Sequence, residues 1–115
     1  VTKEDLGRAT WLLLHTVAAQ YPARPSKQQR KDVAALVHTL TRIYPCGECA
    51  NHFRDIVRSK APATSSAEEL QQWACEVHNL VNASLGKASF NCKLVQARWN
   101  GLDCGTDMAC DMTSR

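Results

Sequence analysis

The chain has 115 residues, of which 44% are hydrophobic, and this is enough for one domain with a core of ordinary size. Fourteen Lys and Arg residues oppose eleven Asp and Glu residues, and a net charge of only +3 with no basic run argues against a nucleic-acid-binding protein. No apolar stretch approaches the length of a membrane span, so we expect no membrane insertion. The sequence does not open with a signal-peptide pattern, so we expect that any targeting segment has been removed or was never present.

Apolar residues recur at steps of three and four, which is the pattern of amphipathic helices. The first helix is expected from Lys3 to Gln20, before Pro22. A second follows the capping box Ser26-x-x-Gln29 and ends near Tyr44, because Pro45 comes next. The residues expected to face the core from these two helices are Leu6, Leu13, Leu14, Val17, Val33, Leu36, Val37, Leu40 and Ile43.

Three further helices are expected in the second half of the chain. The third runs from about Cys46 to Arg58, and the fourth follows the capping pattern Ser66-x-x-Glu69 and runs to Leu85, with Gly86 just past its end. A short fifth helix fits Asn91 to Trp99. The residues expected to face the core here are Phe53, Ile56, Val57, Leu70, Trp73, Val77, Leu80 and Val81.

The last stretch, residues 100–115, contains two Gly, two Cys and few apolar residues, so we expect an irregular tail. Strand-like alternation is nearly absent from the whole chain. Four main helices with short connections therefore predict an all-α fold, namely a four-helix bundle with a short fifth helix.

Six cysteines are the unusual feature of the composition, and they permit 15 connectivities among which the sequence alone does not choose. Cys46 and Cys49 form a CxxC motif directly after Pro45, at an expected helix start. The amides and the dipole of that helix would stabilise a thiolate, and the spacing suits a reversible disulfide. A redox dithiol is the favoured interpretation, and a structural disulfide or two buried thiols is the alternative.

Two further pairs are suggested by position. Cys75 and Cys92 flank the turn between the fourth and fifth helices, where a disulfide would close a loop of about eighteen residues and stabilise the fold by about 3 kcal/mol. A structural role is favoured there. Cys104 and Cys110 bracket five residues of the tail, and a disulfide between them could equally carry electrons or staple the C-terminus.

A zinc site is the main rival to a redox dithiol. Cys46, Cys49, Cys75 and His78 together would supply three thiolates and one imidazole. Both halves of that set fall on expected helices, whereas zinc knuckles usually lie on turns, and Cys92 would lack a partner. A zinc-stapled, non-catalytic interaction module is therefore ranked second. A thioredoxin-like reductase is ranked lower, because no βαβ pattern surrounds the CxxC.

Two helix faces have side chains that suit a flat or polar ligand. His78, Asn79 and Asn82 lie roughly opposite the apolar side of the fourth helix, where a surface hydrogen-bond network is the alternative. The first helix has a related face, on which a tryptophan packed in the core is the alternative. No glycine-rich nucleotide fingerprint is present, so helices would have to bind any dinucleotide. The residues on the face of the first helix are Arg8, Trp11 and His15.

Four motifs follow one another in chain order: Arg8-x-x-Trp11-x-x-x-His15, Tyr44-Pro45-Cys46-x-x-Cys49, Trp73-x-Cys75-x-x-His78-Asn79-x-x-Asn82-x-x-Leu85-Gly86-Lys87, and Cys92 through Arg98-Trp99. Together they resemble the FAD-linked sulfhydryl oxidases of the Erv/ALR family over about residues 6–99. The resemblance implies a four-helix bundle with a short fifth helix that holds FAD noncovalently at one end, commonly as a homodimer.

The resemblance also implies roles for individual residues. Cys46–Cys49 corresponds to the redox disulfide, in which Cys49 would face the isoalloxazine and form the charge-transfer thiolate while Cys46 exchanges with incoming dithiols. Cys75–Cys92 corresponds to a structural disulfide, and the zinc interpretation is correspondingly disfavoured. Cys104–Cys110 is the candidate shuttle pair. The residues that would contact the cofactor are Arg8, Trp11, His15, Cys49, His78, Asn79, Asn82, Lys87, Arg98 and Trp99.

The same resemblance sets the expected reaction and its surroundings. Dithiol proteins would be the substrates, and the electrons would pass through FAD to oxygen, giving hydrogen peroxide, or to a cytochrome-type acceptor. The expected compartment is the mitochondrial intermembrane space, with the secretory pathway as the alternative. Residues 1–100 would form the sulfhydryl oxidase domain and residues 101–115 the tail.

Overall fold

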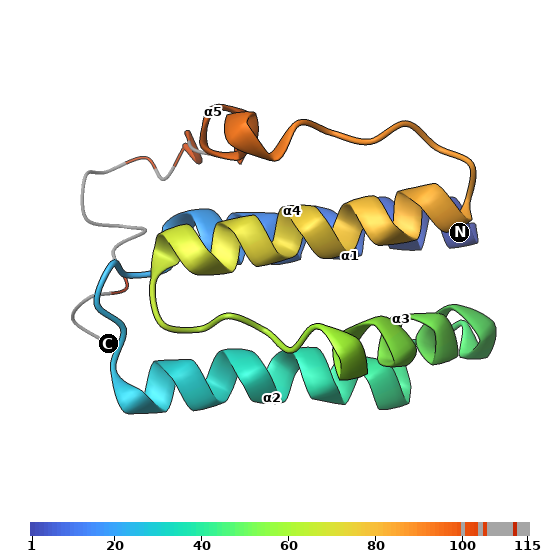
Figure 1. Ribbon diagram of the computed structural model, residues 1–115, viewed down its shortest axis with the longest axis horizontal. Helices are drawn as coiled ribbons and strands as arrows, with labels where there is room; N and C mark the ends of the chain where they lie inside the picture. The colour runs from blue at the N-terminus through green and yellow to red at the C-terminus, as the bar shows by residue number, and fades with distance from the viewer. Residues whose placement is uncertain (100, 104, 106–111, 113–115) are drawn as a thin grey trace.

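The fold is built from helices in the part of the chain that the computed structural model describes, which is residues 1–99, 101–103, 105 and 112 (Figure 1). The long helices are α1 (Lys3–Gln20), α2 (Lys27–Ile43), α3 (Gly47–Ser59) and α4 (Ala67–Ser84). A 3-10 helix, η1 (Cys92–Leu94), continues directly into the short α5 (Val95–Trp99). The predicted all-α bundle with a short fifth helix is confirmed.

The four long helices form two pairs. Helix α1 packs beside α4 and α2 beside α3, and the two members of each pair run in opposite directions (Figure 1). The chain after α4 turns back along that helix and brings α5 against α1 and α4 (Figure 1). None of the described helices has the length and apolar character of a membrane span.

The helix ends follow from local sequence signals. Ser26 and Gln29 exchange both hydrogen bonds of a capping box at the start of α2, and that helix ends two residues before Pro45. Gly86 follows the last turn of α4 with a φ of +72°, which is the left-handed conformation that a residue without a Cβ adopts at little cost. A second capping box, from Thr2 to Asp5, starts α1 and was not among the predicted signals.

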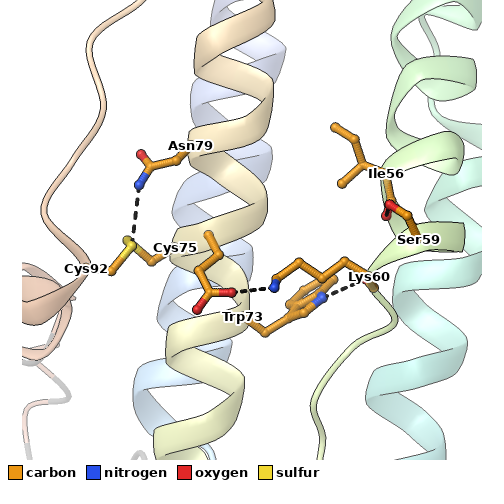
Figure 2. Close-up of polar contacts among 8 residues, drawn as sticks. Ile56, Ser59, Lys60, Trp73, Cys75, Asn79 and Cys92 are labelled. Atoms are coloured by element: carbon orange, nitrogen blue, oxygen red, sulfur yellow. Dashed lines mark hydrogen bonds and ion pairs between the residues drawn. A yellow bond between two sulfur atoms is a disulfide. The ribbon is translucent and has the colours of Figure 1, made fainter.

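The core lies between the two helix pairs. Two hydrogen bonds connect the loop after α3 to this core. The Tyr21 hydroxyl donates to the Thr64 carbonyl at 2.8 Å. Trp73 Nε1 donates to the Lys60 carbonyl at 2.9 Å (Figure 2). The residues of the buried cluster are Ala18, Tyr21, Val37, Val57, Leu70, Trp73, Ala74 and Val77.

Three residues predicted to face the core are instead exposed. Leu13 is 55%, Ile43 67% and Leu80 47% exposed, so these predictions are wrong. The helices pack mainly as two pairs, so neighbouring helices cover only part of each apolar face. Apolar residues at the edge of such a face therefore stay in contact with solvent.

Candidate functional site

Cys46 and Cys49 are joined by a disulfide at the first turn of α3. Cys46 is the N-cap residue, and its Sγ accepts a hydrogen bond from the Cys49 N–H at 3.3 Å. Cys49 is exposed and Cys46 is half-buried, so thiols from solution can reach the pair. When the disulfide opens, the unpaired amides and the dipole of this helix end stabilise the thiolate that is released.

Phe53 connects this helix to aromatic side chains of α1. It follows Cys49 by four residues, so the two side chains share one face of α3. The Phe53 ring and the Trp11 ring of α1 meet in a T-shaped contact, with ring centroids 6.2 Å apart and the planes at 90°. Phe53 therefore links the helix that carries the Cys46–Cys49 disulfide to the aromatic rings described next.

Four rings from α1, α4 and α5 stack in two pairs. Trp11 lies on His78 with centroids 4.1 Å apart and planes at 6°, and His15 lies on Trp99 at 4.3 Å and 2°. The Arg98 guanidinium covers the Trp99 ring at 4.1 Å from its centroid. We call Trp11, His15, His78 and Trp99 the ring cluster.

The two imidazoles of the ring cluster share a hydrogen bond, since His15 Nε2 lies 2.8 Å from His78 Nδ1. Burial, together with the charges of His78 and Arg98, lowers the pKa of His15 to about 4. Burial and the charge of Lys87 lower the pKa of His78 to about 4 as well. Both rings are therefore neutral at pH 7, and one donates to the other across this bond.

The second nitrogen of His15 has no partner among the described residues. His15 is buried, and its Nδ1 makes no hydrogen bond there. A buried polar nitrogen without a partner costs free energy unless a ligand or water satisfies it. A flat heteroaromatic ligand offers both a ring face and polar ring atoms, so the chemistry of the ring cluster fits such a molecule.

The three polar residues predicted to share one face of α4, His78, Asn79 and Asn82, have different partners. His78 joins the ring cluster, whereas the side-chain amide of Asn79 bonds the backbone of Phe90 through both of its polar groups. Asn82 is half-buried, and its carbonyl accepts the Lys87 N–H at 2.8 Å.

Two of the predicted cofactor residues lie apart from the rings. Arg8 is exposed one turn before Trp11, and its Nη2 pairs with Asp5 Oδ1 at 2.6 Å. Lys87 is also exposed, and its charge contributes to the lowered pKa of His78. Five of the predicted cofactor residues therefore lie together, namely the ring cluster of Trp11, His15, His78 and Trp99 and the Arg98 guanidinium over Trp99. Cys104 and Cys110 lie outside the described residues.

The ligand set of the zinc alternative does not assemble. Cys75 forms a disulfide with Cys92, with Cα atoms 5.7 Å apart, and Cys46 is bonded to Cys49. The thiolates that would have bound zinc are thus in disulfides. In the described part of the chain, no group of three or more His, Cys, Asp or Glu residues is placed to hold a metal ion.

Sequence reasoning missed Phe53 and Gln72 as parts of the site region. Gln72 donates from Nε2 to the carbonyl of Cys92 at 2.9 Å. Helical spacing carried a signal for both, since Phe53 follows Cys49 by four residues and Gln72 precedes Cys75 by three.

Known proteins resemble the chain over almost its whole length. It is 57% identical to the "FAD-linked sulfhydryl oxidase ERV1" of Arabidopsis thaliana over 112 residues, which are 97% of this chain and 58% of that protein. It is 46% identical to the "Mitochondrial FAD-linked sulfhydryl oxidase ERV1" of Saccharomyces cerevisiae, over 84% of this chain and 51% of that protein. The chain therefore spans little more than half the length of these curated relatives.

A solved structure with the same fold and a family profile agree with these matches. The crystal structure of the FAD binding domain of Erv1 from Saccharomyces cerevisiae superposes with a TM-score of 0.84 at 44% identity, and the match covers 86% of this chain and 94% of that one. The sequence profile of the Erv1 / Alr family matches residues 8–100. With four-fifths of its residues inside that profile, the chain belongs to the Erv1/Alr family.

Proposed function

We propose that this protein is an FAD-dependent thiol oxidase that forms disulfides in dithiol proteins. The observation that carries the proposal is the accessible Cys46–Cys49 disulfide at the start of α3, on the helix whose Phe53 contacts the ring cluster. The names of the relatives, which are FAD-linked sulfhydryl oxidases, support the same reaction.

The residues of the ring cluster fit FAD. The stacked rings offer flat faces of the kind that bind an isoalloxazine or an adenine, and the unpaired His15 Nδ1 offers a hydrogen-bonding group. We assign residues 1–100 to the FAD-binding domain and residues 101–115 to the tail. The residues assigned to the cofactor site are Arg8, Trp11, His15, Cys49, His78, Asn79, Asn82, Lys87, Arg98 and Trp99.

The protein's own part of the reaction is thiol–disulfide exchange. A substrate thiolate attacks Cys46 Sγ, a mixed disulfide forms, and Cys49 leaves as a thiolate held by the helix end. The second substrate thiol then attacks the substrate sulfur that is bonded to Cys46, which forms the substrate disulfide and releases Cys46. The substrate thereby loses two electrons and two protons, and Cys46 and Cys49 gain them. FAD, when bound, supplies two-electron acceptance, which returns the pair to its disulfide form.

The remaining parts of the proposal extend this reaction to its surroundings. Oxygen, giving hydrogen peroxide, or a cytochrome-type protein is the final acceptor. Cys104–Cys110 passes electrons from substrate to Cys46–Cys49, and Cys75–Cys92 supports the fold. The protein acts as a homodimer in the mitochondrial intermembrane space. A mitochondrial location is supported by the name of the yeast relative.

The visible spectrum tests the proposal directly. The purified protein should show a flavin band at about 450 nm that dithiothreitol bleaches without oxygen. Cys49→Ser should keep the band and lose dithiol oxidation, while His52→Gln, an exposed change on the same helix, should behave like the parent. Protein that stays colourless after incubation with FAD, or Cys49→Ser with parental turnover, would refute the proposal.

A further inference from the structure

Three side chains that follow one another along one face of α4, at successive helical turns, hold the segment that leads into α5. Gln72, Cys75 and Asn79 are spaced by three and four residues. Gln72 Nε2 donates to the Cys92 carbonyl at 2.9 Å, and Cys75 forms the disulfide with Cys92. Asn79 reaches two residues further back along the segment, to Phe90.

Both polar groups of the Asn79 amide are used in this contact. Its Oδ1 accepts the Phe90 N–H at 2.9 Å, and Nδ2 donates to the Phe90 carbonyl at 2.8 Å. The Nδ2 group also donates to Cys92 Sγ at 3.4 Å (Figure 2). One acceptor and two donor hydrogens are thereby satisfied, and the Phe90 N–H fixes which end of the amide is oxygen. A carboxylate cannot make this contact, because it has no hydrogen to give to the Phe90 carbonyl.

We propose that Asn79 is a positioning residue that holds the Phe90–Cys92 segment and thereby keeps Trp99 stacked on His15. The chain runs from Cys92 through η1 straight into α5, at whose end Trp99 covers His15 at 4.3 Å. A disulfide fixes the segment at one residue only. The paired hydrogen bonds at Phe90 add a second attachment and so set the direction in which the segment enters η1.

This inference deepens the proposed function, because it makes Asn79 act on the cofactor site through α5 instead of through direct contact with FAD. The inference rests on the proposed function only in taking the ring cluster to be part of the FAD site. The attachment itself is visible in two signals that need no cofactor. These are the hydrogen exchange of the Phe90 amide and the ring-current shift that Trp99 causes at His15 in proton NMR spectra.

The experiment compares Asn79→Ala and Asn79→Asp with the parent, and uses Gln96→Ala, an exposed change on α5, as the matched control. Asn79→Ala should speed exchange at Phe90 roughly tenfold, as expected for loss of a hydrogen bond, and reduce the shift at His15. Asn79→Asp keeps an acceptor for the Phe90 N–H, so it should retain much of the exchange protection while still reducing the shift. Gln96→Ala should change neither signal.

Titration with FAD then separates this inference from the proposed function. Affinity should fall roughly tenfold in Asn79→Ala, with the absorbance band of the bound flavin unmoved, because the Asn79 amide bonds the backbone of Phe90 and not the flavin. Weaker FAD binding with unchanged Phe90 exchange and His15 shift would overturn the inference and make Asn79 a direct ligand. Parent protein that binds no FAD would refute the proposed function, while the two NMR signals would still decide the role of Asn79.

Discussion

Mild acid should destabilise this protein through the hydrogen-bonded imidazoles of His15 and His78. Each has a pKa of about 4 in the folded protein, mainly because burial disfavours the charged ring. An unfolded chain returns both to the ordinary value of about 6.5. Between these values the unfolded chain binds more protons than the fold does, so stability is complete above about pH 6.5 and falls as the pH drops towards 4.

The size of the effect follows from these two pKa values. Between pH 7 and pH 5, each histidine should remove about 2 kcal/mol from the free energy of unfolding, and the two together about 4 kcal/mol if they titrate independently. The hydrogen bond between His15 Nε2 and His78 Nδ1 makes protonation of the second imidazole more costly than protonation of the first. After one imidazole is protonated, one nitrogen still donates to the other across 2.8 Å, but after both are protonated two N–H donors face each other.

Urea unfolding at pH 7, 6 and 5 measures this dependence. His15→Phe keeps a flat ring against Trp99 but takes up no proton, so about half of the acid-induced loss should disappear even if the variant is less stable overall. His52→Gln, exposed on α3, should retain the parental loss. A parental pH dependence in His15→Phe, or a free energy of unfolding that stays constant from pH 7 to 5, would show that this imidazole pair does not control acid stability.

Three further predictions concern the fold and can be measured by chemical or thermal unfolding. Leu70→Ala should lower the free energy of unfolding by about 2–5 kcal/mol, because Leu70 is 3% exposed in the core. Leu12→Ala, at an exposed position, should change it by less than about 0.5 kcal/mol, and equal losses in the two variants would contradict the described core. Gly86→Ala should cost about 1–2 kcal/mol because it places a Cβ at a φ of +72°, and a neutral result would mean that the α4 end adopts another conformation. Ser26→Ala should cost about 1 kcal/mol by removing the acceptor at the start of α2, and restoration by Ser26→Asp would attribute that loss to capping.

The elements of this fold could be predicted because their signals are local. Pro45 ends α2, Ser26 and Gln29 begin it, and the glycine after α4 supplies the left-handed residue at its end. The CxxC motif lies within four consecutive residues, so a redox role could be proposed from its spacing and helix-start position, and the structure places the Cys46–Cys49 disulfide at that helix start. Burial was less predictable, since Leu13 and Leu80 show the same periodicity as core residues and yet lie at the edge of the packed face.

By itself, then, the sequence determined the helices, the cap of α2 and the CxxC motif that makes Cys46 and Cys49 the candidate redox pair, because these depend on interactions within a few residues along the chain. Only the tertiary structure decided which side chains from distant helices meet. It placed His15 against His78 across 63 residues of sequence, stacked Trp99 on His15, and directed Asn79 to the backbone of Phe90. Helical periodicity indicates which face a residue occupies, but the partner of that face depends on how whole helices pack, which no local pattern specifies.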